Sequence, residues 1–166
     1  MILGMSKATY TFLHVLISLV GIGSGAVVMF GFLTRRRLDG WTAVFLATTA
    51  LTSLTGFAFP FVRLLPSHIL GALPLAVLAV VIPARYVFHL AGAWRWIYVV
   101  GAALALYLNV FVAVVQAFLK VPALQALAPT QTEPPFLAAQ LVVMAVFMAL
   151  TIVATKRFHL EPARAA

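Results

Sequence analysis

Five long apolar runs, separated by short polar or basic connections, constrain the fold of this chain more than any other feature. Each run is close to the 20 or so residues that an α-helix needs to cross the hydrocarbon core of a bilayer. The composition agrees, because 64% of the 166 residues are hydrophobic and only 8% are charged. Water would leave much of that apolar surface unmatched, whereas lipid matches it. The sequence therefore predicts an all-α membrane protein, a helical bundle in contact with the lipid bilayer.

The predicted membrane-spanning helices belong to one transmembrane domain, residues 1–166, and cover residues 9–33, 42–61, 68–90, 96–118 and 136–155. The first run is too long for the apolar region of a signal peptide, and the basic cluster Arg35–Arg37 follows it directly. We therefore expect this run to remain in the mature protein. Pro122 is suited to the first turn of a short interfacial helix, and a polar loop follows it.

The distribution of basic residues predicts an orientation with the N-terminus outside and the C-terminus inside. Loops on the side of the C-terminus then hold eight Lys and Arg residues and loops on the other side hold three, as the positive-inside rule requires. The inner set is Arg35, Arg36, Arg37, Arg85, Arg95, Lys156, Arg157 and Arg164, and the outer set is Lys7, Arg63 and Lys120. Trp94, Trp96 and Tyr98 then lie at the inner membrane interface, where amphipathic rings are stable.

Several classes of function are disfavoured by the composition. The net charge of +8 comes from short clusters between apolar runs, so no nucleic-acid partner is expected. The chain has no cysteine, which excludes disulfides, thiolate metal sites and covalently attached c-type haem. The three acidic residues, Asp39, Glu133 and Glu161, are all expected in loops or the tail. The sequence predicts no catalytic residue and no carboxylate of the kind that ion-coupled transporters place within the membrane.

Uncharged polar residues gather in the outer half of the predicted bundle and form the candidate ligand site. The set is His14, Ser18, Thr52, Thr55, His68, Asn109, Gln116 and Gln140. Gly21 and Gly25 share a helix face with His14, and their spacing allows close approach of a neighbouring helix. Each polar group in hydrocarbon needs a partner, and either a neighbouring helix or a bound ligand can supply it.

His14 and His68 are the candidate metal ligands, for a non-covalent b-type haem near the outer surface. Their depths differ by roughly 7 Å at 1.5 Å per residue, whereas two axial imidazoles prefer matching depth. The position of His68 at the start of a helix also favours its neutral form without any metal. Haem ligation and simple interfacial location therefore both stay open for this pair.

Three stretches resemble small integral membrane proteins that are widespread in proteobacterial sequences and have no assigned activity. They are Leu65–His68, Arg85–His89 and Leu127–Phe136. The resemblance covers most of the chain and implies a multi-pass protein of the bacterial inner, cytoplasmic, membrane. It implies no functional residue.

The leading functional hypothesis is a small, non-catalytic accessory subunit that binds a quinone or haem b near the outer leaflet, within an electron-transport complex. Such a site has apolar walls and a few convergent polar groups. A second hypothesis is a structural or assembly subunit of a larger membrane complex. A third is a channel or facilitator for a small neutral solute, with Asn109 and Gln116 lining the path.

Overall fold

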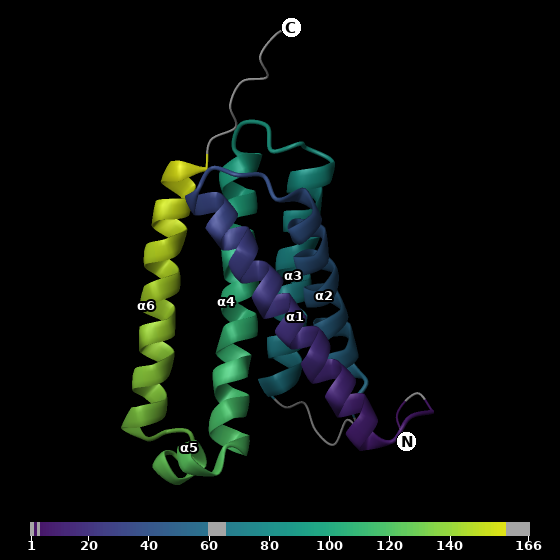
Figure 1. Cartoon of the computed structure of the whole chain (residues 1–166), viewed down its shortest axis with the longest axis vertical. Helices are drawn as coiled ribbons and strands as arrows, with labels where there is room; N and C mark the ends of the chain where they lie inside the picture. The colour runs from purple at the N-terminus through teal and green to yellow at the C-terminus, as the bar shows by residue number, and fades with distance from the viewer. Residues whose placement is uncertain (1, 3, 60–65, 159–166) are drawn as a thin grey trace, which may run out of the picture.

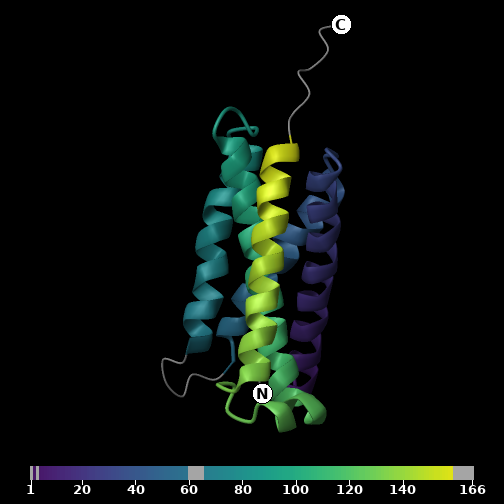
Figure 2. The same cartoon turned by 90° about the vertical axis from the view of Figure 1, so that its left-hand side faces the viewer.

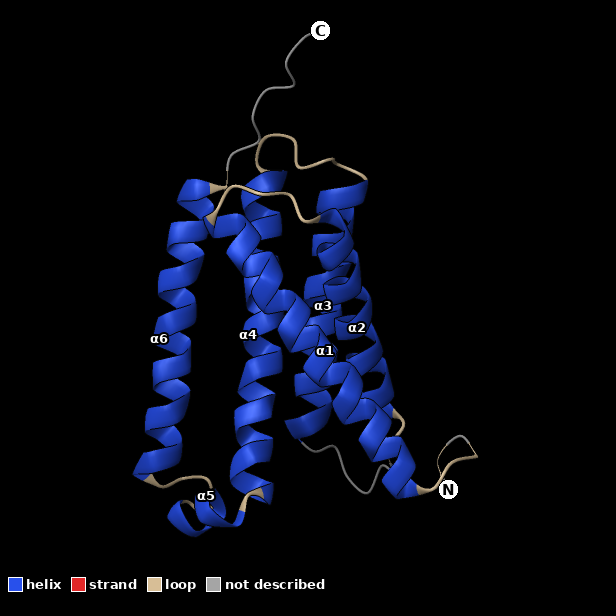
Figure 3. Cartoon of the chain, viewed as in Figure 1, coloured by secondary structure: helices blue, strands red, loops and turns tan. Residues whose placement is uncertain are grey.

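The computed structural model describes residues 2, 4–59 and 66–158, with the backbone alone for 66–70. The described residues form six α-helices and the fold is all-α, as the sequence predicts (Figure 3). The helices are α1 (Lys7–Leu33), α2 (Asp39–Phe57), α3 (Pro66–Tyr86), α4 (Trp94–Lys120), α5 (Pro122–Leu127) and α6 (Pro134–Arg157). The short helix expected after Pro122 is confirmed as α5.

The five long helices run up and down the long axis of the molecule, and α5 lies across one end (Figure 1). Helix α1 crosses α2 obliquely and packs on it, while α4 contacts α1, α3, α5 and α6. Seen from the side, α6 covers α4 as an outer helix (Figure 2). The start of α1 shares one end of the bundle with α5, and the end of α6 shares the opposite end with the α3–α4 turn.

Three helices, α1, α4 and α6, are long and apolar enough to cross a membrane, by length and composition. Helix α6 has few buried residues and is apolar on all sides, which suits contact with lipid. Large apolar side chains are also exposed along α1 and α6, among them Phe12 and Val142. This is the makeup of a multi-pass membrane protein, because such a surface is stable in hydrocarbon rather than in water.

The main core lies toward the end of the bundle that carries the α3–α4 turn. It joins the second half of α1, the first halves of α2 and α4, the end of α3 and Phe158. Phe32 meets the rings of Tyr98 and Phe158 edge to face, with centroids 5.4 Å and 5.0 Å apart. A smaller cluster of Phe118, Ala128 and Phe136 packs α5 against α4 and α6 at the other end. The bundle is therefore packed more extensively at one end than at the other.

Three predicted helix ends lie three or four residues from those of the structure. Helix α3 ends at Tyr86 rather than at residue 90, because the backbone N–H groups of Val87 and Phe88 both donate to the Pro83 carbonyl. His89 and Leu90 then adopt positive φ angles of 48° and 60°, which end the helix. Helix α2 starts at Asp39, three residues before the predicted start at 42. It ends at Phe57, four residues before the predicted end at 61.

The loop between α5 and α6 is built around the Glu133 carboxylate. One carboxylate oxygen accepts hydrogen bonds from the backbone N–H and the hydroxyl of Thr130, at 3.1 Å and 2.8 Å, and the other accepts from the Thr132 N–H at 3.0 Å. Slight desolvation raises the pKa of Glu133, but these hydrogen bonds outweigh it and lower the pKa below its ordinary value. The Gln131 amide donates to the Val115 carbonyl at 2.9 Å and fixes the loop on α4.

Candidate functional site

His14 lies half-buried between α1 and α2, in the half of the bundle that contains the start of α1. Its Nδ1 is 2.8 Å from the hydroxyl oxygen of Thr55 on α2. The imidazole meets the Phe59 ring edge to face, with centroids 5.3 Å apart. Ser18 is one turn further along α1, and its hydroxyl donates to the His14 carbonyl at 2.7 Å. Of the predicted site residues, His14 and Thr55 are therefore in contact across the α1–α2 interface, while the Ser18 hydroxyl bonds to its own helix.

The hydrogen bonds of Thr55 determine which nitrogen of His14 carries the proton. The Thr55 hydroxyl oxygen lies 2.7 Å from the Leu51 carbonyl oxygen and 3.1 Å from the Thr52 carbonyl oxygen. Carbonyl oxygens only accept, so the single hydroxyl proton of Thr55 is donated to them. Its oxygen is then the acceptor for His14, so Nδ1 carries the proton in the neutral ring. His14 Nε2 is left as an acceptor, and within the described residues it makes no hydrogen bond.

The His14 side chain is half-buried, so the imidazole is partly accessible from outside the helix pair. Two buried side-chain atoms in the described part of the chain lack a hydrogen-bond partner, Thr52 Oγ1 and Gln140 Oε1. Tyr10 supports the site, since its hydroxyl donates to the Thr55 carbonyl at 2.8 Å and its ring contacts Phe59. Tyr10 is one helical turn from His14, a spacing that could have identified it in the sequence.

Two of the other predicted site residues, Asn109 and Gln140, lie at separate helix interfaces. The Asn109 amide on α4 donates to the Thr49 hydroxyl on α2 at 3.0 Å, with both side chains buried. The Gln140 amide on α6 donates to the Phe111 carbonyl on α4 at 3.2 Å. Gln116 is exposed on α4. None of these three side chains makes a described hydrogen bond to His14.

The predicted pairing of His14 with His68 lies outside what the structure describes. His68 is the third residue of α3, and its side chain is outside the described residues. Within the described part of the chain, no group of three or more His, Cys, Asp or Glu residues could hold a metal ion. The haem hypothesis for these two histidines stays a prediction.

A charged cluster that the sequence did not reveal lies at the opposite end of the bundle. Arg85 on α3 is buried and forms an ion pair with Asp39, whose side chain is largely exposed. The Arg85 guanidinium also donates to the Tyr98 hydroxyl at 3.1 Å, and it lies over the Tyr98 ring at 5.2 Å from its centroid. The Tyr98 hydroxyl donates in turn to Thr42 at 3.5 Å.

This cluster corrects two predictions. Asp39 is the first residue of α2 and not a loop residue, and Arg85 is a buried partner in α3 and not a loop cation. Tyr98 is fully buried in the bundle, and its expected location at the inner membrane interface stays a prediction. A cation inside an apolar run needs a partner, and Asp39 is the acidic residue nearest a helix end on the predicted inner side. The ion pair of Arg85 and Asp39 could therefore have been predicted from the sequence.

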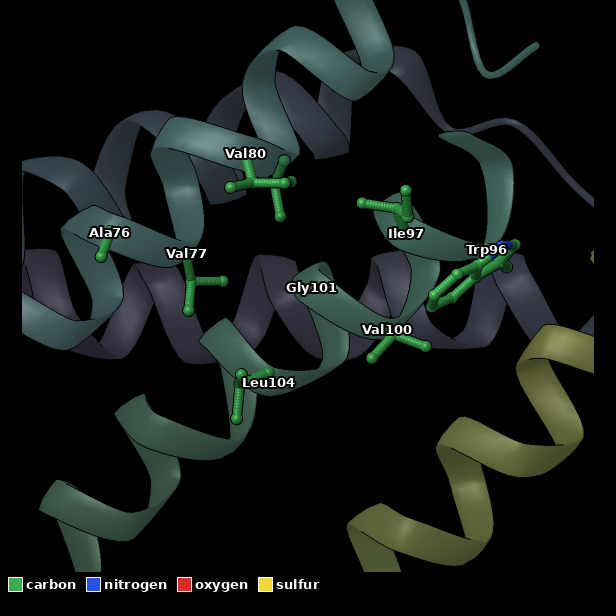
Figure 4. A pocket seen from close by; sticks show the side chains of 9 residues that line it. Ala76, Val77, Val80, Trp96, Ile97, Val100, Gly101 and Leu104 are labelled. Atoms are coloured by element: carbon green, nitrogen blue, oxygen red, sulfur yellow. The ribbon is translucent and has the colours of Figure 1, made fainter. Parts of the chain in front are cut away.

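Two apolar grooves lie on the bundle, and neither is lined by a predicted site residue. The larger has a volume of about 420 Å³ and lies between α3 and α4 (Figure 4). The smaller has a volume of about 260 Å³ and lies among α1, α4 and α6. Both offer carbon surface, so they suit apolar chains rather than polar solutes.

Comparison with known proteins gives no match, neither to a protein-family model, nor to a curated protein, nor to a solved structure.

Proposed function

We propose that this chain is a five-span protein of the bacterial cytoplasmic membrane, with the N-terminus outside and the C-terminus inside. Helices α2 and α3 have 19 and 21 residues and run beside the three long apolar helices, so they have the length of spans. Basic residues support the orientation, because Arg35, Arg36, Arg37, Arg95, Lys156 and Arg157 lie near the end that would face the cytoplasm. Among described residues, Lys7 and Lys120 lie at the other end.

Within this protein, we assign His14 as the residue that binds an amphipathic ring compound of the quinone class near the outer leaflet. The observation that carries this proposal is the hydrogen bond from Nδ1 to Thr55, which holds the half-buried imidazole in one orientation and leaves Nε2 without a partner among the described residues. In functional histidines, one ring nitrogen typically makes a hydrogen bond that fixes the ring orientation and the tautomer, while the other nitrogen binds the ligand. Phe59 supplies an apolar ring face beside the imidazole.

The protonation of His14 selects between the redox forms of such a ligand. A neutral Nε2 accepts a hydrogen bond, so it suits the hydroxyl of a quinol and not the carbonyl of a quinone. A charged imidazolium is disfavoured in this half of the bundle, since the described residues place no carboxylate against His14. The proposed role is that of a non-catalytic subunit which holds a quinol for a partner in electron transport.

The test compares quinol binding by three variants reconstituted in lipid nanodiscs under anaerobic conditions. His14→Leu should weaken binding of a short-tailed ubiquinol about tenfold, the cost of one hydrogen bond in a site without water. Thr55→Val keeps the imidazole but removes its orienting partner, and we expect an intermediate loss. His89→Asn, at an exposed turn position, is the matched control and should bind as the wild type does.

Equal quinol affinity in all three variants would refute the role of His14. An absorption spectrum of the mildly solubilised protein provides a separate test of haem, because a Soret band lost in His14→Leu would identify haem b as the ligand. Each variant is checked for monodispersity, so that loss of binding is not confused with loss of fold.

A structural or assembly subunit is the second candidate, and one observation favours it. Asn109 and Gln140 are both used in hydrogen bonds between helices, to Thr49 and to the Phe111 carbonyl. Interhelical bonds of this kind stabilise a bundle without any ligand. Co-purification of a stoichiometric membrane partner, with no quinol retained, would place this function first. Flux of a neutral solute in liposomes would instead support the channel hypothesis.

A further inference from the structure

The larger apolar groove runs along the contact of α3 and α4. From α4 it is lined by Trp96, Ile97, Val100, Gly101 and Leu104, which recur at helical spacing and share one face (Figure 4). From Trp96 to Leu104 the groove extends over about 12 Å, at 1.5 Å per residue. From α3 it is lined by Ala76, Val77, Val80 and Val81. A long, narrow shape with carbon walls suits a single hydrocarbon chain.

Gly101 lets the two helices approach closely at the floor of the groove. A Cβ added at Gly101 would collide with the Val81 side chain, which is fully buried. The rim of the groove is open, because Val80, Trp96 and Leu104 are 47%, 53% and 39% exposed. The groove therefore opens to the outside of the bundle along its length rather than to the interior.

Positive charge is concentrated at one end of this groove. Trp96 lies near the start of α4, and Arg95 precedes it as a half-buried residue. The same end of the bundle carries Arg35, Arg36, Arg37, Lys156 and Arg157. Among the residues that the structure describes, the acidic residue at this end is Asp39, and it is paired with Arg85. A molecule whose apolar part fills the groove therefore meets a net positive surface at its head.

We propose that the α3–α4 groove holds an acyl chain of an anionic phospholipid, of the phosphatidylglycerol type, with the phosphate beside Arg95 and Trp96. Trp96 lines the groove and carries an indole N–H donor, and Arg95, the residue before it, has a guanidinium that matches a phosphate in charge and geometry. Cations beside a membrane favour anionic over zwitterionic lipids. This proposal is independent of the His14 site, which lies between α1 and α2.

The test uses native mass spectrometry of the whole protein, taken from nanodiscs that contain equal amounts of phosphatidylglycerol and phosphatidylcholine. Wild-type protein should retain one phosphatidylglycerol in preference to phosphatidylcholine. Arg95→Gln should reduce this preference about fivefold, the effect of one cation near a lipid head group. Arg37→Gln makes the same charge change at the same end, in the exposed loop before α2, and should leave the preference unchanged.

A second pair of variants tests the groove itself. Ala76→Phe places a ring in the groove and should abolish retention of the lipid. Ala145→Phe makes the same change at an exposed position on α6, away from both grooves, and should have no effect. Equal retention by Ala76→Phe and Ala145→Phe would overturn the proposal. A wild-type dimer that Ala76→Phe dissociates would also overturn it, because the groove would then be an interface between copies.

Discussion

The packing of α1 against the bundle depends on Gly25, and two substitutions of α1 glycines isolate that dependence. A Cβ added at Gly25 would lie 2.6 Å from Leu106 Cδ1 and 2.8 Å from Phe45 Cε2. Both neighbours are buried, at 4% and 1% exposure; Leu106 borders the smaller groove, so the Phe45 ring is the neighbour with less room to move. A Cβ added at Gly23, two residues earlier on the same helix, would meet nothing within 4 Å.

The expected difference in unfolding free energy follows from comparing Gly23→Ala with Gly25→Ala. Both remove the backbone freedom of a glycine, which stabilises a helix by about 0.4–1 kcal/mol. That gain cancels when the two variants are compared. The remaining difference is the steric cost of one methyl group forced into a filled core, about 1–3 kcal/mol. We therefore expect Gly25→Ala to be less stable than Gly23→Ala by that amount.

The assay is reversible unfolding in mixed micelles with rising SDS content, followed by circular dichroism. Gly23→Ala should unfold at the same or a higher SDS fraction than the wild type, and Gly25→Ala at a lower one. Gly25→Leu should shift the transition further, since a larger side chain enlarges the collision. Identical transitions for the two alanine variants would mean that α1 does not pack on Phe45 and Leu106 as the structure shows.

Three further perturbations have defined outcomes. Asp39→Ala leaves the buried Arg85 charge without its partner and should destabilise the bundle by about 1–3 kcal/mol in SDS titrations. Adding Arg85→Met to the Asp39→Ala protein should restore part of this stability. No recovery in the double variant would argue against the ion pair. Asn109→Leu should cost about 0.6–1.7 kcal/mol, whereas Gln116→Leu, at an exposed position, should cost nothing measurable. The lowered pKa of Glu133 means that its hydrogen bonds stabilise the α5–α6 loop above the ordinary pKa of a Glu and are lost as the pH falls through the lowered value. Amide NMR shifts of the loop should titrate with a midpoint below that of a free Glu, and Glu133→Gln should abolish that titration.

The long helices could be predicted because each depends on an apolar run and its ends. Pro122 and Pro134 begin α5 and α6, where a missing backbone N–H costs nothing. The end of α3 could not be predicted, since it is set by two amides that share the Pro83 carbonyl and by the turn after it. Apolar residues continue through that turn, so composition alone placed the helix end four residues late.

The inward face of α2 was harder to predict, because core and lipid both accept apolar side chains. Thr42, Thr49 and Ser53 are buried against the bundle, while Thr52 and Thr55 are only partly buried. In a soluble protein the exposed face would carry charges and would identify the buried one. Here hydrocarbon surrounds the bundle, and threonine hydroxyls also bond to their own helix, as the Thr55 hydroxyl does with the Leu51 carbonyl. The single outer cluster predicted from the sequence is therefore divided among several interfaces.

The two ends of the bundle differ in how they are held together. The Arg85–Asp39 pair and the Tyr98 hydroxyl connect α2, α3 and α4 beside the larger core. Near the start of α1, the described contacts between α1 and α2 are neutral hydrogen bonds and aromatic edges, centred on His14 and Thr55. Because the larger core and the ion pair lie far from His14 along α1, removing its imidazole should leave folding largely intact. Loss of quinol from a His14→Leu protein that keeps its wild-type unfolding transition would then report on binding alone.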